Sequence, residues 1–232
     1  MERKDLFDVV VVRGVDALPF LHSQFAADLN SIGDGQQRWS ALLNPQGRVL
    51  HVVAVLRLAA DEWRLLVPFN RGDELLDLLR RFVFRRKVSM TLAPELHVTP
   101  GPPNAIGPVL MLSEAVSDVL VMADLDRFIN AGLALIDRGA SGRHLAHALR
   151  LDRFEAFSVK KGCYPGQEIV ARTHFLGRNK RVLVRLDRQD QRPWCSGDVL
   201  RDGDAEVGEI VCAGGEHALA VLVLPVATGH VL

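Results

Sequence analysis

The sequence predicts an α+β protein, and three patterns along its 232 residues carry that prediction. Short apolar runs bounded by turn residues, beginning with Leu6 to Val12, are typical of buried strands. Two stretches repeat apolar residues at spacings of three and four, as one face of a helix does. From Arg181 onward, short apolar segments alternate with Gly- and Asp-rich turns, which favours a small all-β unit.

The first helix is expected to begin after Asp16, a residue suited to the N-cap, and to run through Ile32. Two strands should follow, at 38–43 and 48–58. The turn residues Asn44-Pro45-Gln46-Gly47 separate them, so the pair is predicted to form a hairpin.

Another strand is expected from Trp63 to Val67, followed by a second helix near 75–83. Five cations lie within Arg80 to Lys87 at the end of that helix, where positive charge complements the helix dipole. The Pro- and Gly-rich segment from Thr99 to Pro108 predicts a loop or a boundary between subdomains. Further short strands are expected at 109–112, 119–122, 133–136, 182–186, 198–201, 207–213 and 217–224.

The charge composition gives no sign of a nucleic-acid partner. Lys and Arg total 28, as do Asp and Glu, so the formal net charge is zero and long-range attraction to polyanions is absent. The cluster at 80–87 is explained by the helix end, and aromatic residues interleaved with basic ones are scarce. Direct nucleic-acid binding is therefore not expected.

The cysteines and histidines predict neither a disulfide framework nor a metal site. Cys163, Cys195 and Cys212 form an odd set without a Cys-x-x-Cys pair. His144 and His147 have a spacing that places two imidazoles on one helix face, and a solvated face is the expected explanation. With no apolar run of membrane-spanning length and no secretory signal, a monomer in the reducing cytoplasm, away from membranes, is expected.

The densest chemical pattern in the chain is Lys161-Gly162-Cys163-Tyr164-Pro165-Gly166-Gln167-Glu168. Pro165 is suited to the first position of a helix, which would place Cys163 just before a helix N-terminus. That position and the adjacent Lys160 and Lys161 both favour a thiolate. The residues predict a reactive or ligand-facing thiol, and a small buried residue before a turn remains the alternative.

This segment, extended to Arg172, resembles the signature of the YgfZ/GcvT-like folate-binding family, whose members are related to the glycine cleavage T-protein. The segments 14–28, 43–49 and 208–211 are similar to other parts of that family. The chain is short for the family, and the missing length falls between about Ala93 and Asn130.

The resemblance implies an α+β fold with GcvT-like N-terminal and ferredoxin-like units and a small C-terminal β-barrel. The folate-binding region would span 1–180, with an abbreviated ferredoxin-like part at about 48–130, and the barrel would span 181–232.

The resemblance also implies a function: a folate-binding accessory protein that supports iron–sulfur enzymes and tRNA modification. Tetrahydrofolate is the implied cofactor, in a central channel, and iron–sulfur enzymes are the implied partners. Cys163 and Lys161 are the implied catalytic pair. The implied folate contacts are Asp137, Phe7, Tyr164, Gln167, Glu168 and Arg172.

Three departures from the family pattern bear on the chemistry. The T-protein has paired aspartates where this chain has 47–52, a stretch without a carboxylate, which disfavours the alternative function of aminomethyl transfer. Asp137 stands where the family has glutamate. Phe7, and either Ala131 or Gly132, occupy positions where relatives have tryptophans beside the folate.

Overall fold

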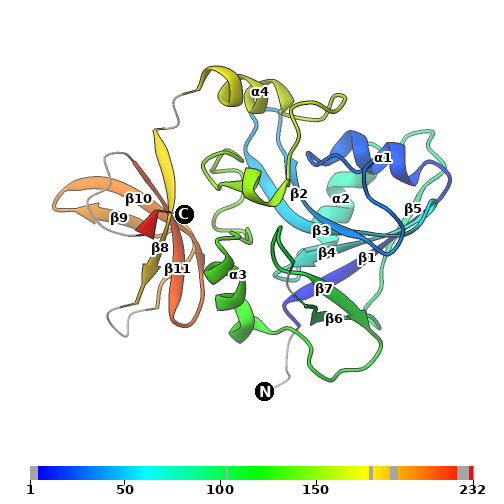
Figure 1. Ribbon diagram of the computed structural model, residues 1–232, viewed down its shortest axis with the longest axis horizontal. Helices are drawn as coiled ribbons and strands as arrows, with labels where there is room; N and C mark the ends of the chain where they lie inside the picture. Colours follow the sequence, from blue (N-terminus) through cyan, green and yellow to red (C-terminus); the bar gives the residue numbers. More distant parts are fainter. Residues whose placement is uncertain (1–4, 103, 178–179, 189–192, 224–229, 232) are drawn as a thin grey trace.

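The computed structural model describes residues 5–102, 104–177, 180–188, 193–223 and 230–231. Within these residues the chain forms two five-stranded sheets, a two-stranded hairpin and several short helices, so the predicted mixture of helix and sheet is confirmed. Figure 1 shows the two larger sheets at opposite ends of the molecule, with α3 (Leu125–Ala131) between them. The helices in this part of the chain lack the length and apolar character needed to cross a bilayer.

The N-terminal sheet is antiparallel and buried on both faces. Along its strand β1, Val10 and Val12 pack into one core, whereas Phe7 and Val9 pack into the other. This alternation explains why the strand is apolar at nearly every position. The sheet has the order β2 (Gln37–Leu43), β3 (Val49–Ala59), β4 (Glu62–Pro68), β1 (Phe7–Arg13) and β5 (Ser89–Leu92).

The predicted hairpin and the strand after it are confirmed, but the first helix is shorter than predicted. Helix α1 spans Ala17–Gln24 and therefore ends eight residues before Ile32. The chain leaves the helix there because Phe25 forms a bridge with Leu42, and the next backbone N–H donates to Ala41. Pairing with the sheet edge thus overrides the helical apolar spacing.

The second helix, α2, spans Gly72–Arg80, and tight turns replace helix from 81 to 85. Asp16 precedes α1 as predicted, yet its carboxylate makes no cap hydrogen bond within α1. Instead, Asp16 accepts a 2.7 Å hydrogen bond from the backbone N–H of Lys87 and so secures the turns after α2.

The middle of the chain differs most from the prediction. Strands β6 (His97–Pro100) and β7 (Leu110–Ser113) form a separate hairpin around the predicted loop. Helix α3 was not predicted, and the segments 119–122 and 133–136 are not strands. Residues 133–136 are fully buried but form an irregular connection. A short apolar run in the sequence is equally consistent with a buried strand and with a buried connection of this kind.

The predicted ferredoxin-like part at about 48–130 is divided between two structures. Its strands β3, β4 and β5 share one sheet with β1 and β2, and β6, β7 and α3 lie outside that sheet. The remaining short elements are the 3₁₀ helices η1 (Met122–Asp124) and η2 (Leu151–Phe154) and the helix α4 (Gln167–Leu176).

The four strands predicted after Arg181 are present. The C-terminal sheet has the order β12 (His230–Val231), β8 (Arg181–Asp187), β11 (His217–Val223), β10 (Ala205–Ala213) and β9 (Val199–Asp202). Among the described residues β12 and β9 are open edges, so closure of this sheet into a barrel stays a prediction.

Candidate functional site

The side chain of Lys161 is directed into the protein and holds the end of α1. Its ammonium donates to the backbone carbonyls of His22 at 2.5 Å, Ala27 at 2.9 Å and Phe25. Burial lowers its pKa to about 8, and the carboxylate of Asp28 acts in the opposite direction. Three carbonyls at the point where α1 ends therefore share one cation, as expected for a helix C-terminus.

The loop around Cys163 is held by its own side chains as well. Tyr164 is buried, its hydroxyl donates to the Ser158 carbonyl at 2.9 Å, and burial raises its pKa to about 12. The amide of Gln167 donates to the Lys161 carbonyl at 3.0 Å, and the Lys161 ammonium lies 4.9 Å from the centre of the Tyr164 ring. These contacts give the loop a defined shape.

Two glycines bring this loop against the turn of the β2–β3 hairpin. Gly166 has φ +77, and a Cβ there would lie 2.5 Å from the Asn44 oxygen and 2.7 Å from the Cα of Gly47. Gly47 has φ +71, and a Cβ there would lie 2.8 Å from the Cβ of Ile169. The contact requires glycine on both sides, since any side chain would occupy space already filled.

The helix after this loop begins later than predicted. α4 starts at Gln167, with Gly166 in the left-handed region as its N-cap, so the prediction that Pro165 opens the helix is wrong. Proline restricts the residue before it, and Gly166 then reverses the chain with its positive φ. Cys163 is exposed in the loop ahead of this turn.

The predicted catalytic pair thus divides into an exposed thiol and a largely buried cation. Cys163 presents its sulfur to solvent, and the hydrogen bonds of Lys161 go to the end of α1. Activation of the thiol by Lys161 stays a prediction. Glu168 and Arg172 are exposed on α4, where they could meet a ligand only from the solvent side.

Asp137 lines a pocket of about 320 Å³ on the side of the C-terminal sheet. One of its carboxylate oxygens accepts the backbone N–H groups of Gly139 at 2.9 Å and Ala140 at 3.2 Å. The other oxygen accepts the hydroxyl of Ser196. The other lining residues are Phe69, Met122, Leu125, Trp194, Cys195, Cys212 and Ala213.

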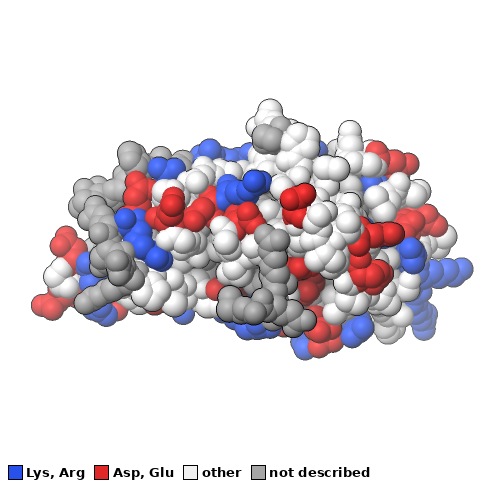
Figure 2. Space-filling model, turned by 90° about the horizontal axis from the view of Figure 1, so that it is seen from below, with Lys and Arg blue, Asp and Glu red and all other residues white. Residues whose placement is uncertain are grey.

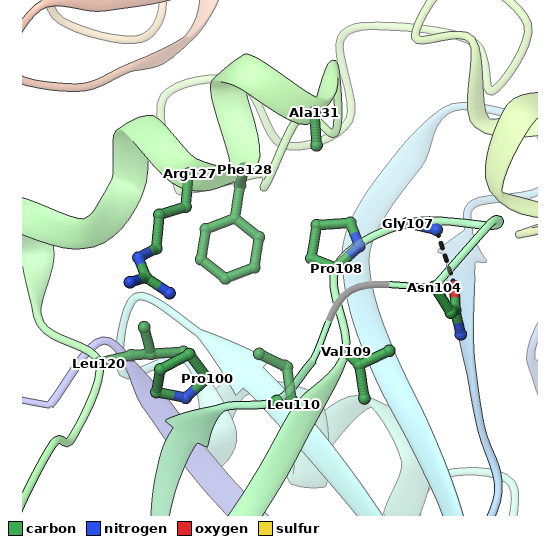
Figure 3. Close-up of a pocket in the computed structure, with 11 residues that line it drawn as sticks. Pro100, Asn104, Gly107, Pro108, Val109, Leu110, Leu120, Arg127, Phe128 and Ala131 are labelled. Carbon is green, nitrogen blue, oxygen red and sulfur yellow. Dashed lines mark hydrogen bonds between the residues drawn. The ribbon is translucent and has the colours of Figure 1, made fainter.

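Phe7 does not line the Asp137 pocket, but it packs against Phe128, which lines a second pocket of similar volume. Its ring is buried and lies 5.6 Å from that of Phe128, centre to centre. Figure 3 shows Phe128 and Ala131 of α3 facing the loop that carries Pro108 across this second, largely apolar pocket of about 320 Å³. Neither this pocket nor the Asp137 pocket is lined by Phe7, Asp137 and the Cys163 loop together, so their gathering around one folate stays a prediction.

Two buried residues near Asp137, Arg71 and His51, were not singled out by the sequence analysis. The guanidinium of Arg71 donates to the carbonyls of Leu50 at 3.2 Å and Ile136 at 2.9 Å, next to Asp137. His51 is buried, and burial together with Arg71 lowers its pKa to about 3, so the ring is neutral. His51 lies in the stretch that lacks the T-protein carboxylates. In the sequence, nothing distinguished Arg71 from the other arginines.

The histidine pair at 144 and 147 is not a solvated helix face, so that interpretation is wrong. His144 is buried, and its Nε2 lies 3.4 Å from a carboxylate oxygen of Glu209 in β10. The ring of His147 lies 4.7 Å from that of Phe157. Within the described residues, no group of three or more His, Cys, Asp or Glu side chains could hold a metal ion. Cys212 is buried as expected, which raises its pKa to about 12.

Comparison with known proteins identifies both sequence and structural relatives. The chain is 24% identical over 247 residues to a tRNA-modifying protein YgfZ of Colwellia psychrerythraea, covering 88% of this chain and 75% of the relative. It is 36% identical over 107 residues to the protein of that name from Aliivibrio fischeri, covering 42% of this chain and 33% of the relative. No family model matches.

The fold is similar to the crystal structure of glycine cleavage system aminomethyltransferase T from Bartonella henselae. The TM-score is 0.69 at 15% identity, covering 94% of this chain and 76% of that one. The architecture is therefore that of a GcvT-like protein. Together with the two relatives named YgfZ, this likeness in fold supports a YgfZ/GcvT-like family for the chain.

Proposed function

We propose that this chain is a folate-binding accessory protein of the YgfZ kind that supports iron–sulfur enzymes in tRNA modification. The observation that carries the proposal is the exposed thiol of Cys163 on a loop held at both ends by buried contacts. Such a loop fixes where the sulfur is presented, and an exposed thiol is accessible to a partner protein or a ligand.

Cys163 is expected to react fastest of the three cysteines with iodoacetamide at neutral pH. Cys212 should be the last labelled, because it is buried and its pKa is raised. Cys195 is also exposed and is the matched control for simple accessibility. Mass spectrometry after brief labelling measures the order, and faster labelling of Cys195 than of Cys163 would contradict a special role for the motif.

Cys163→Ser is then expected to leave the melting temperature unchanged and to abolish the biological activity. The relevant assay is restoration of modified tRNA in a bacterial strain that lacks its own YgfZ. Cys195→Ser serves as the control. Normal restoration by the Cys163 variant would contradict the proposed role of the thiol.

The pocket at Asp137 fits the ring system of a folate. Its volume of about 320 Å³ lies at the small end of ligand pockets, which suits the pterin with the tail directed outward. Phe69 and Trp194 supply aromatic surface, and the carboxylate of Asp137 matches the adjacent N–H donors of a pterin edge. The Ser196 hydroxyl would have to turn away for both donors to be accepted.

Calorimetry is expected to detect tetrahydrofolate binding, and Asp137→Asn should weaken it about tenfold or more, since a hydrogen bond to a charged group is lost. Glu168→Gln removes an exposed carboxylate from α4 and is the matched control. If no heat appears at millimolar ligand, the chain has no folate site. If only the Glu168 variant loses affinity, folate binds at the Cys163 loop instead.

The alternative function is tetrahydrofolate-dependent aminomethyl transfer, which the likeness to aminomethyltransferase T favours. Bound tetrahydrofolate would supply the one-carbon acceptor. The neutral, buried His51 in the stretch that lacks the carboxylates disfavours this reaction. An assay of one-carbon transfer from an aminomethyl donor distinguishes the two, and turnover would favour the enzyme.

A further inference from the structure

The turns after α2 place two aromatic rings among five cations at the surface. Phe84 is 89% exposed and Phe82 is 53% exposed, although aromatic side chains are normally buried. We call this surface the 80–87 patch; its cations are Arg80, Arg81, Arg85, Arg86 and Lys87. Figure 2 shows Lys and Arg side chains gathered at the end of the molecule (right) that carries α1, α2 and β5 in Figure 1.

Most of these cations are not neutralised by carboxylates. Arg80 forms a 3.2 Å ion pair with Asp77, an exposed contact. None of the ion pairs within 4.0 Å among the described residues involves Arg81, Arg85, Arg86 or Lys87. The carboxylate of Asp16 also lies at the patch, where it accepts a hydrogen bond from the backbone N–H of Lys87. The patch therefore keeps a concentrated positive charge on a protein whose net charge is zero.

The backbone holds the Phe84 ring outward. Phe84 has φ +45, a region that bulky residues rarely adopt. The segment is anchored after Phe84, because a Cβ at Gly14 would lie 2.0 Å from the Lys87 oxygen and the Arg86 guanidinium lies 5.8 Å from the Phe20 ring centre. It is anchored before Phe84 by the backbone N–H of Phe82, which donates to the Leu79 carbonyl at 2.9 Å. An unfavourable backbone conformation that exposes an aromatic ring indicates a binding role.

We propose that the 80–87 patch binds single-stranded RNA, with Phe84 as a stacking platform and the surrounding cations on the phosphates. An exposed ring beside free cations is the combination that sequence-tolerant single-strand binding uses. The expectation against nucleic-acid binding rested on the zero net charge, on the helix end as the explanation of these cations, and on a scarcity of aromatics among the basic residues. At this patch the rings are present and exposed.

The ring and the guanidinium together favour RNA over an anionic membrane. The Arg85 guanidinium lies 5.5 Å from the Phe84 ring centre. An anionic membrane surface offers phosphates to the cations but no planar ring to the face of Phe84. A nucleotide offers both, because its base can stack on the ring while its phosphate pairs with the arginine.

Helix α1 connects the patch to the loop that carries Cys163. The turns of the patch are anchored at the start of α1 through Asp16, and Lys161 binds the end of the same helix. Eight helical residues span about 12 Å. A strand bound at the patch can therefore extend along α1 toward the thiol, which agrees with the tRNA-modification role proposed above. The exposed ring and the cations on which the patch proposal rests are independent of the proposed folate and thiol roles.

The test is fluorescence anisotropy of a short labelled oligouridylate with the full chain. The wild type is expected to bind at low salt, and Phe84→Ala to weaken binding about tenfold. Phe175→Ala is the matched control, since Phe175 is 70% exposed on α4.

The double variant Arg81→Gln with Arg85→Gln should lower the slope of log affinity against log salt concentration by about 1.4. Arg127→Gln with Arg201→Gln removes the same charge elsewhere.

Three results would overturn the proposal: no binding by the wild type at low salt, equal loss in Phe84→Ala and Phe175→Ala, or binding to vesicles of phosphatidylglycerol and phosphatidylcholine but not to the oligonucleotide. The patch variants should keep wild-type melting temperatures and wild-type tetrahydrofolate affinity. A failure at the patch is therefore distinguishable from a failure of the folate and thiol roles.

Discussion

Gly166→Ala is expected to destabilise the protein by about 3 kcal/mol or more and to abolish the activity that depends on Cys163. The left-handed conformation costs alanine about 1 kcal/mol. A Cβ at 2.5 Å from the Asn44 oxygen and 2.7 Å from the Gly47 Cα adds a clash with two backbone segments, neither of which can turn away as a side chain does. Urea denaturation monitored by circular dichroism measures the loss.

The motif contains its own control for this substitution. Gly162 lies in the same loop, and a Cβ there would meet no atom within 4 Å. Gly162→Ala is expected to change the free energy of unfolding by less than about 0.5 kcal/mol. Gly203→Ala isolates the cost of positive φ, since Gly203 has φ +58 in open space. A Gly166 variant as stable as the Gly203 variant would refute the close contact with the hairpin turn.

Lys161→Met is expected to lower the free energy of unfolding by about 2 kcal/mol, because three carbonyls lose their shared donor. The acceptors are at the residues His22, Phe25 and Ala27, and the site is partly accessible to water, which moderates the loss. Lys160→Met is the matched control, since Lys160 is the exposed neighbour in sequence. Equal stability of the two variants would contradict the role of Lys161 in holding α1.

The pH dependence of stability provides an independent signature of the buried cation. In the folded protein burial lowers the pKa of Lys161 to about 8, whereas a lysine in an unfolded chain has a pKa of about 10.4. Between these values the unfolded chain binds more protons, so the free energy of unfolding contributed by Lys161 rises with pH. The difference in stability between wild type and Lys161→Met should therefore widen from about pH 8 to pH 10.

A widening difference distinguishes this cation from an ordinary surface lysine, for which stability differences stay flat over that range. Tyr164 and Cys212 have raised pKa values and titrate in both proteins, so the comparison removes their contribution. Urea denaturation at several pH values supplies the measurement. A difference that narrows as pH rises would mean that the folded protein stabilises the ammonium.

The sequence alone determined the elements in which one local signal dominates. The hairpin at 37–59 was predictable because strong turn residues separate two apolar runs, and the C-terminal strands because short runs alternate with Gly- and Asp-rich turns. The motif at 161–168 was recognisable from its residue types alone, and the relatives named YgfZ agree with the resemblance it carries.

Only the tertiary structure decided what these residues contact. Helix α1 ends at Gln24 because a sheet edge captures Phe25, and Lys161 binds that end because the loop is folded against it. Local spacing cannot encode the carbonyls that Lys161 binds, since they lie 134 to 139 positions away along the chain. The same reason leaves Phe84 exposed, because burial depends on neighbours that distant segments supply.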